Sequence, residues 1–210
     1  MKNKIPQFAY HMTKFFTEYL PIQRNLSPNS IATYRDTFRL LLLFYDTEKH
    51  IKPNLLTLDM LDVQGIEDFM LWLKKERNCG ASTCNQRLGA LKSFFRYLQF
   101  ALPDRALQCQ ENLAIRPMKQ SEPGLKYLTI DGIKLLLEQP DIKTKYGRRD
   151  LAILSLMYDT GARVQEIADI KIVHIRFSAP ATIRITGKGD KTRVVPLLSR
   201  TEDILKQYIK

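Results

Sequence analysis

Apolar residues recur at helical spacing near the start of the chain. Between Phe8 and Leu20 they fall three or four positions apart, which predicts an amphipathic helix. Ser27 followed by Pro28 is typical of a helix start, because serine caps the first turn and proline suits its backbone angles. A second helix is therefore predicted from Asn29 to about Glu48, with one broad apolar face.

Two further helices follow the same pattern. Asp62 is expected to cap a third helix, and Gly80 to interrupt the chain before Ser82 caps a fourth. In both segments apolar residues again recur every three or four positions. Four amphipathic helices joined by short connections predict a compact helical bundle.

The helical pattern fails over residues 112–126, where two prolines and Gly124 punctuate a polar stretch. This composition predicts a linker, and an ordered loop within one domain is the alternative. We therefore expect a helical domain over residues 1–111, a linker over 112–126 and a second domain over 127–210.

In the second domain, the spacing of apolar residues changes from one typical of helices to one typical of strands. Thr129 is expected to cap a short helix, and Asp150 to open an apolar helix that ends at Gly161. Farther along, residues alternate as in strands on both sides of the turn sequence GKGDKT, which predicts a β-hairpin. The predicted elements are helices at 130–138, 150–160, 163–169 and 201–208, and strands at 181–186 and 193–197.

Charge indicates the class of partner. The formal net charge is +11, from 33 Lys and Arg against 22 Asp and Glu. Residues 1–110 hold 15 basic and 10 acidic residues, and residues 111–210 hold 18 and 12, so the halves carry +5 and +6. A basic charge on both halves favours one extended polyanion, and nucleic acid or an anionic membrane is the usual partner of such a chain. A solvated basic surface without a specific partner is the alternative.

Other features argue against a membrane, metal or cofactor. The most apolar run, Leu40–Tyr45, is too short to span a bilayer, and the N-terminus does not have the pattern of a signal peptide. The three cysteines are Cys79, Cys84 and Cys109, and no two of them form a CxxC pair. This pattern argues against both a disulfide framework and a zinc site. We therefore expect a cytoplasmic protein with no cofactor.

Two motifs in the second domain carry candidate chemistry. Arg163 follows a helix-ending glycine and begins the next helix, where a guanidinium can hold two phosphate oxygens. A surface arginine paired with Glu166 is the alternative. Lys188 stands between two glycines at the hairpin tip, where it can reach a phosphate or a leaving oxygen. The alternative there is a tight turn with solvated lysines.

A third motif lies at the head of the fourth predicted helix. Small hydroxyl and amide side chains beside an arginine suit a helix end that touches DNA, although capping by Ser82 alone is the alternative. The candidate DNA-binding residues are Ser82, Thr83, Asn85, Arg87, Lys92, Arg96, Lys191 and Arg193.

Together these motifs resemble those of the tyrosine recombinase, or phage integrase, family. The segments SPNSIATYRDTFRLLLLFY and STCNQRLGALKSFFRYL are similar to two helices of the family's core-binding domain. The segments DLAILSLMYDTGARVQEIADI and IRITGKGDKTRVVPL follow in the family's order. The resemblance runs from about Phe8 to Lys210. It implies a mainly α fold, with an N-terminal helical, SAM-like core-binding domain and the first part of a mixed α+β catalytic domain that contains a β-hairpin.

The resemblance also implies roles for three residues. Arg163 resembles the first catalytic arginine, which stabilises charge on the scissile phosphate, and Glu166 resembles the acidic residue that supports the site. Lys188 resembles the lysine that donates a proton to the departing 5′ oxygen. The implied reaction is strand cleavage through a 3′-phosphotyrosine and religation, for site-specific recombination or integration of a mobile element. The implied partners are double-stranded DNA and further copies of the protein on DNA, a tetramer in the family.

The family's remaining motifs are not found after the hairpin. The family has a His-x-x-Arg pair, a later His or Trp and the nucleophilic Tyr there, whereas the histidines here are His11, His50 and His174. Tyr208 has no His-x-x-Arg before it and is interpreted as a helix-face residue. We therefore expect a chain truncated before its nucleophile and inactive alone. A non-cleaving module that occupies recombination sites is the alternative. A helix-turn-helix transcription factor is a third hypothesis, which leaves the GKG hairpin unexplained.

Overall fold

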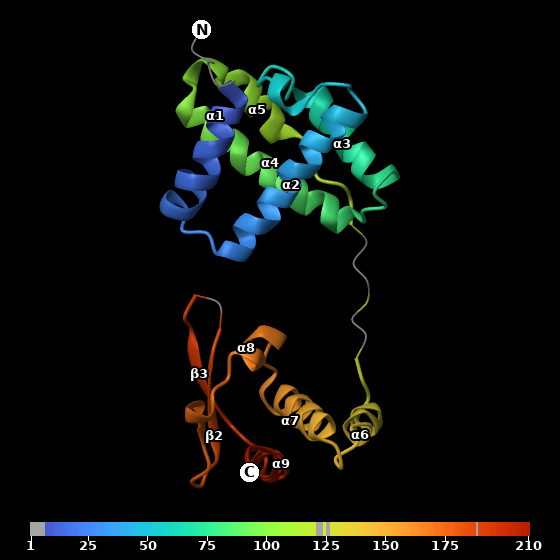
Figure 1. Ribbon diagram of the computed structural model, residues 1–210, viewed down its shortest axis with the longest axis vertical. Coiled ribbons are helices and arrows are strands. Elements are labelled where there is room, and N and C mark those ends of the chain that lie inside the picture. Colours follow the sequence, from blue (N-terminus) through green and yellow to red (C-terminus); the bar gives the residue numbers. More distant parts are fainter. Residues whose placement is uncertain (1–6, 121–123, 125–126, 188) are drawn as a thin grey trace. The chain divides into compact units, whose positions relative to one another are not determined.

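The computed structural model describes residues 7–120, 124, 127–187 and 189–210 of the chain. The chain divides into two compact units, Met1–Pro123 and Gly124–Lys210, which we call unit 1 and unit 2 (Figure 1). Within the described residues, no helix is both long and apolar enough to cross a membrane.

Unit 1 is a bundle of helices whose starts follow the sequence signals. Ser27 Oγ accepts the N–H of Ser30 at 3.3 Å, and Asp62 Oδ1 accepts the N–H of Gly65 at 2.8 Å, so both predicted caps are confirmed. The elements of unit 1 are α1 (Gln7–Lys14), η1 (Phe15–Gln23), α2 (Pro28–Thr47), η2 (Pro53–Leu55), α3 (Val63–Lys75), α4 (Ala81–Ala101), η3 (Pro103–Arg105) and α5 (Ala106–Ala114).

Two details of these helices differ from the prediction. The predicted cap at Ser82 is wrong, because Gly80 already has the extended backbone of an N-cap and α4 begins at Ala81. The side chain of Ser82 is therefore exposed in the first turn. The first helix also widens into the π-helix η1, with Pro21 inside it. Proline has no N–H to donate, so regular α-helical bonding cannot continue through this residue.

The helix α5 is an element that the apolar pattern does not predict. Side-chain amides hold it to the loop before α3, since Gln108 donates to the carbonyl of Leu58 at 2.6 Å and Asn112 to that of Leu61 at 2.9 Å. Asn112 is buried in this helix, although composition places it in a linker. Ile115, just after the helix, is only 8% exposed. Ordered packing therefore continues past residue 111.

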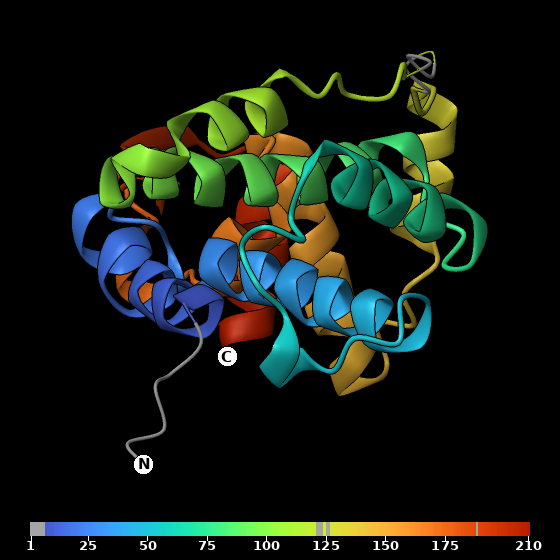
Figure 2. The ribbon, with the colours of Figure 1, turned by 90° about the horizontal axis from the view of Figure 1, so that it is seen from above.

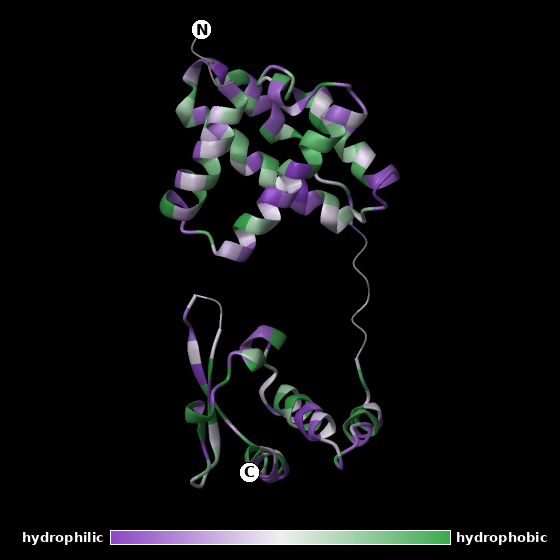
Figure 3. Cartoon of the chain, in the orientation of Figure 1, coloured by the Kyte–Doolittle hydropathy of each residue, from purple (hydrophilic) through white to green (hydrophobic). Residues whose placement is uncertain are grey.

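The core of unit 1 is aromatic and centres on α4, which contacts α2, α3, α5 and η1 (Figure 2). Phe15, Phe38 and Phe94 are almost completely buried and pack ring against ring, with centroids 5.1–5.9 Å apart. Each such ring contributes roughly 1.5–3 kcal/mol by its burial. Hydrophobic and hydrophilic residues are interspersed along each of these helices (Figure 3), as the amphipathic pattern predicts.

In its described residues, unit 2 combines four α-helices and one 3-10 helix with a small sheet. Thr129 and Thr144 cap α6 and α7 by accepting N–H groups of Gly132 and Gly147. Because Thr144 is the cap, α7 begins five residues before the predicted start at Asp150. The elements are α6 (Ile130–Glu138), α7 (Lys145–Thr160), α8 (Val164–Ala168), η4 (Ile172–His174), β1 (Ile175–Arg176), β2 (Thr182–Thr186), β3 (Thr192–Pro196) and α9 (Ser199–Ile209).

The sheet has the antiparallel order β1-β2-β3, and β2 and β3 form the predicted hairpin. Alternation along β2 buries Ile183 and Ile185 and leaves Arg184 exposed. The two buried isoleucines pack with Leu156 of α7 and Leu205 of α9 in one cluster. This core holds the hairpin beside the α7–α8 junction, where the candidate residues lie.

Candidate phosphate-binding site and nucleic-acid interface

Arg163 lies at the junction of α7 and α8. The helix α7 ends at Gly161, whose left-handed backbone (φ 57°) lets its N–H donate to the carbonyl of Met157 at 3.0 Å. Arg163 is the N-cap of α8, and its side chain is 78% exposed. The glycine that ends α7 is thus followed, at the start of α8, by an arginine whose side chain is largely exposed.

Glu166 is the buried partner that joins this junction to the hairpin. One oxygen, Oε1, accepts Nη1 of Arg163 at 3.0 Å. The other, Oε2, accepts the backbone N–H of Arg163 at 3.1 Å and Nη2 of Arg193 at 2.8 Å. The Glu166 side chain is only 5% exposed. We call Arg163, Glu166 and Arg193 the arginine–glutamate cluster.

The electrostatics of the cluster favour the ionised carboxylate. Hydrogen bonds from Arg193 and then from the backbone and side chain of Arg163 lower the pKa of Glu166 to about 2, against an ordinary value of 4.5. Two cations around one carboxylate leave the cluster with a net positive charge at neutral pH. The cluster therefore suits an anion such as a phosphate.

Gly187 at the start of the hairpin turn allows the close approach to Glu166. A Cβ atom at this position would stand 2.6 Å from Oε1 of Glu166, closer than real contacts allow. The N–H of Gly187 donates to the carbonyl of Lys191 at 2.9 Å and closes the turn. Lys188 lies outside the described residues. Lys191 is exposed beside the turn.

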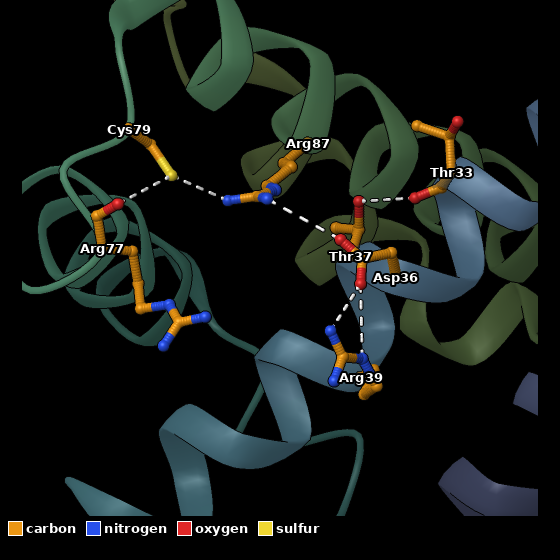
Figure 4. Close-up of polar contacts among 7 residues, drawn as sticks. All are labelled: Thr33, Asp36, Thr37, Arg39, Arg77, Cys79 and Arg87. Carbon is orange, nitrogen blue, oxygen red and sulfur yellow. Dashed lines mark hydrogen bonds and ion pairs between the residues drawn. The ribbon is translucent and has the colours of Figure 1, made fainter.

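Arg87 of α4 is held between two other elements of unit 1 (Figure 4). Its Nη1 donates to Sγ of Cys79 at 2.9 Å, and its Nη2 lies 3.7 Å from Oδ2 of Asp36 on α2. The same aspartate accepts Nη2 of Arg39 at 2.8 Å. The Arg87 side chain is only 17% exposed, whereas that of Arg39 is 73% exposed. Arg39 is thus the more accessible of the two guanidinium groups beside Asp36.

The other candidates on α4 fall into two groups. Ser82, Thr83 and Arg96 are exposed. Asn85 and Lys92 are half-buried and bond to the backbone of Met118 and Ile115, respectively. The structure therefore brings together Arg163, Glu166 and Arg193, and separates the α4 candidates into solvent-facing and inward-facing sets.

Sequence reasoning assigned Arg193 to DNA and missed its ion pair with Glu166, which lies 27 positions away. A signal was present in the strand, since Arg193 alternates with Val195 and Leu197, and both of these pack on the core. An arginine on the inner face of a strand is expected to need a carboxylate partner. The contact of Arg87 with Cys79 has no comparable signal in the sequence.

Known families match both units. Residues 14–100 match the family model described as "Phage integrase, N-terminal SAM-like domain". Residues 126–210 match the model described as "Phage integrase family". The chain belongs to the phage integrase, or tyrosine recombinase, family. Its mainly helical fold, with a SAM-like first domain and a small antiparallel sheet in the second, is confirmed as predicted.

Two curated relatives illustrate the similarity. The chain is 35% identical to y4rC of Sinorhizobium fredii, which is named as an integrase/recombinase, over 95% of this chain and 60% of that protein. It is 31% identical to tyrosine recombinase XerD of Listeria monocytogenes, over 93% of this chain and 63% of that protein. The chain thus spans about three-fifths of the length of these relatives.

Solved structures share the fold. The XerH site-specific recombinase bound to difH substrate matches with a TM-score of 0.62 at 20% identity, over 100% of this chain and 63% of that one. The Tn1549 transposon integrase in complex with circular intermediate DNA matches with a TM-score of 0.66 at 12% identity, over 98% of this chain and 65% of that one.

Proposed function

We propose that this chain binds duplex DNA and supplies part of the catalytic site of a tyrosine recombinase that acts on a mobile element. The observation that carries this proposal is the arginine–glutamate cluster. Glu166 accepts hydrogen bonds from both Arg163 and Arg193, and the Arg163 side chain remains 78% exposed. A guanidinium that is fixed at one edge and open at the other is suited to bind a phosphate.

The proposed reaction has two steps. A tyrosine attacks the scissile phosphate, forms a 3′-phosphotyrosine bond and releases a 5′ oxygen, which leaves with a proton. A 5′ hydroxyl of a new partner strand then attacks that bond, restores the phosphodiester and frees the tyrosine. We assign Arg163 to charge stabilisation in both steps, Glu166 to supporting Arg163, and Lys188 to donating the proton. This reaction conserves the phosphodiester energy and requires no cofactor.

We assign the DNA contacts to exposed residues of both units. In unit 1 these are Ser82 and Thr83 in the first turn of α4 and Arg96 farther along it, and in unit 2 Lys191 beside the hairpin turn. Hydroxyl groups and cations of this kind contact the DNA backbone and fix the protein's register. Self-association of several copies on the DNA is part of the same proposal.

The test of binding is a mobility-shift titration of the 210-residue chain with duplex DNA over a range of salt concentrations. Affinity should fall steeply with salt, and Arg163→Ala should reduce the slope of log K against log salt by about 0.9, the value for one phosphate contact. Arg149→Ala is the matched control, because Arg149 is also exposed in unit 2 and paired with a carboxylate, that of Asp150. Binding that does not depend on salt would contradict the proposal.

The test of chemistry is covalent capture on a nicked suicide substrate. We propose that these 210 residues form no adduct, because in-line attack needs a positioned tyrosine and several cations acting together. Tyr208 lies on α9 and is 41% exposed, and we assign it no catalytic role. A covalent band that Tyr208→Phe abolishes would show that Tyr208 is a nucleophile. A chain that binds DNA without any chemistry, even when extended with the family's remaining motifs, would favour the non-cleaving binding module.

A further inference from the structure

The chain leaves unit 1 along the surface of α4. After α5 ends at Ala114, Nζ of Lys92 donates to the carbonyl of Ile115 at 2.6 Å. Three residues later, Asn85 forms two hydrogen bonds with the backbone of Met118. Its Nδ2 donates to the carbonyl at 2.8 Å, and its Oδ1 accepts the N–H at 2.7 Å. Residues 115–118 are therefore held at both ends.

The spacing of these contacts matches the geometry of a chain that runs antiparallel to α4. Lys92 and Asn85 are seven positions apart, which puts them on one face of the helix, about 10.5 Å apart along its axis. Three residues of extended chain span about 10–11 Å. The segment from Ile115 to Met118 thus follows two turns of α4 toward the N-terminal end of that helix.

Packing and charge support the same path. Ile115 is 8% exposed and belongs to the core of unit 1, and Met118 packs against that core. The carbonyl that Lys92 contacts is that of the C-cap of α5, and a cation is favoured at a helix C-terminus. The pKa of Lys92 is lowered, first by its own burial and then by the positive charge of the neighbouring Arg96. The ammonium group of Lys92 is thus partly desolvated in the folded chain.

We propose that Asn85 and Lys92 are positioning residues for the connection between the units and do not contact DNA. They fix the exit of the chain at the N-terminal end of α4, beside the exposed Ser82 and Thr83. Only residues 119–129 then remain to reach the cap of α6 at Thr129. These 11 residues span at most about 40 Å, whereas the 15 residues after Ala114 would span about 54 Å if both contacts were lost. The inference rests on the proposed DNA binding of both units.

The salt dependence of DNA binding distinguishes a positioning residue from a phosphate ligand. Lys92→Met keeps the aliphatic stem and removes the charge. For the Lys92→Met variant, the slope of log K for DNA binding against log salt should equal that of the unchanged chain. Arg96→Met, one turn farther along α4, is the matched control and should reduce the slope by about 0.9. A reduction of the same size in Lys92→Met would show that Lys92 binds a phosphate and would overturn the proposal.

Hydrogen exchange of the Met118 amide tests the contact itself. Asn85→Ala should accelerate this exchange about 3- to 10-fold, the factor that corresponds to one hydrogen bond. Asn85→Asp retains the acceptor for this N–H but sets a second acceptor against the Met118 carbonyl, so it should restore only part of the protection. Gln86→Ala, at an exposed neighbouring position on α4, should not change it. Exchange that is unchanged in Asn85→Ala would overturn the proposed exit path. An unchanged chain that does not bind DNA would instead contradict the proposed function, and the exchange result would still decide whether the exit path exists.

Discussion

Replacing Gly187 with alanine should destabilise unit 2 and disturb the arginine–glutamate cluster at once. The added methyl group would stand 2.6 Å from Oε1 of Glu166, whereas ordinary contacts begin at 3.4 Å, so one of the two must move by about 0.8 Å. The carboxylate cannot turn away easily, because Arg163 and Arg193 hold both of its oxygens. The hairpin must therefore shift, or the bond between Arg163 and Oε1 must lengthen.

The expected cost is that of overpacking a well-filled site, about 1–3 kcal/mol. For a unit of this size, 1 kcal/mol lowers the melting temperature by about 4–8 °C. Thermal unfolding followed by circular dichroism should therefore show Gly187→Ala melting about 4–24 °C lower. In the mobility-shift titration, the same variant should resemble Arg163→Ala, because the guanidinium loses its fixed position.

A second glycine provides the control. Gly89 lies in the interior of α4, and a Cβ atom there would have nothing within 4 Å. Gly89→Ala should stabilise unit 1 by about 0.4–1 kcal/mol, because alanine restricts the unfolded chain and favours the helix. If Gly187→Ala were as stable as the unchanged chain, the close approach of the hairpin to Glu166 would be refuted.

Three further predictions follow from the same structure. Phe94→Ala should lower the free energy of unfolding of unit 1 by about 3–5 kcal/mol in a denaturant titration, because the ring is fully buried among other aromatic rings; Phe100→Ala, whose ring is 85% exposed, is the control. Because folding lowers the pKa of Glu166 from 4.5 to about 2, its contribution to stability is present above pH 4.5 and is lost as pH falls to about 2; Glu166→Gln should remove this part of the acid-unfolding profile. Limited trypsin digestion should cut first after the exposed Lys119, giving fragments 1–119 and 120–210, and early cuts within α2–α4 would contradict the division into two units.

Helix caps were predictable because they depend on neighbours within a few positions. Ser27, Asp62 and Thr129 each bond to an N–H three residues later, and Gly161 ends α7 in the left-handed region. The hairpin was equally predictable, since its alternation and its two glycines are local features. Where two local signals competed, as for the start of α4 at Gly80 or Ser82, backbone geometry decided the outcome.

Contacts between distant positions were not predictable from local pattern. Asn85 is an ordinary polar residue in a helix until Met118, 33 positions later, comes to lie against it. In the same way, α5 owes its place to amide contacts with residues about 50 positions earlier, and its own apolar pattern is weak. The candidate residues on α4 could thus be named from the sequence, but the separation into exposed and inward-facing sets required the folded chain.

The arrangement around Glu166 has a consequence for how related sequences diverge. One carboxylate fills the space beside position 187 and also neutralises the guanidinium at position 193. Aspartate at position 166 would withdraw the carboxylate by one methylene group, which would make room for a side chain at 187 and leave Arg193 without a partner. Substitutions at 166, 187 and 193 are therefore expected to arise together among homologues, so covariation of these three columns should identify the docked hairpin even where the GKG sequence itself has changed.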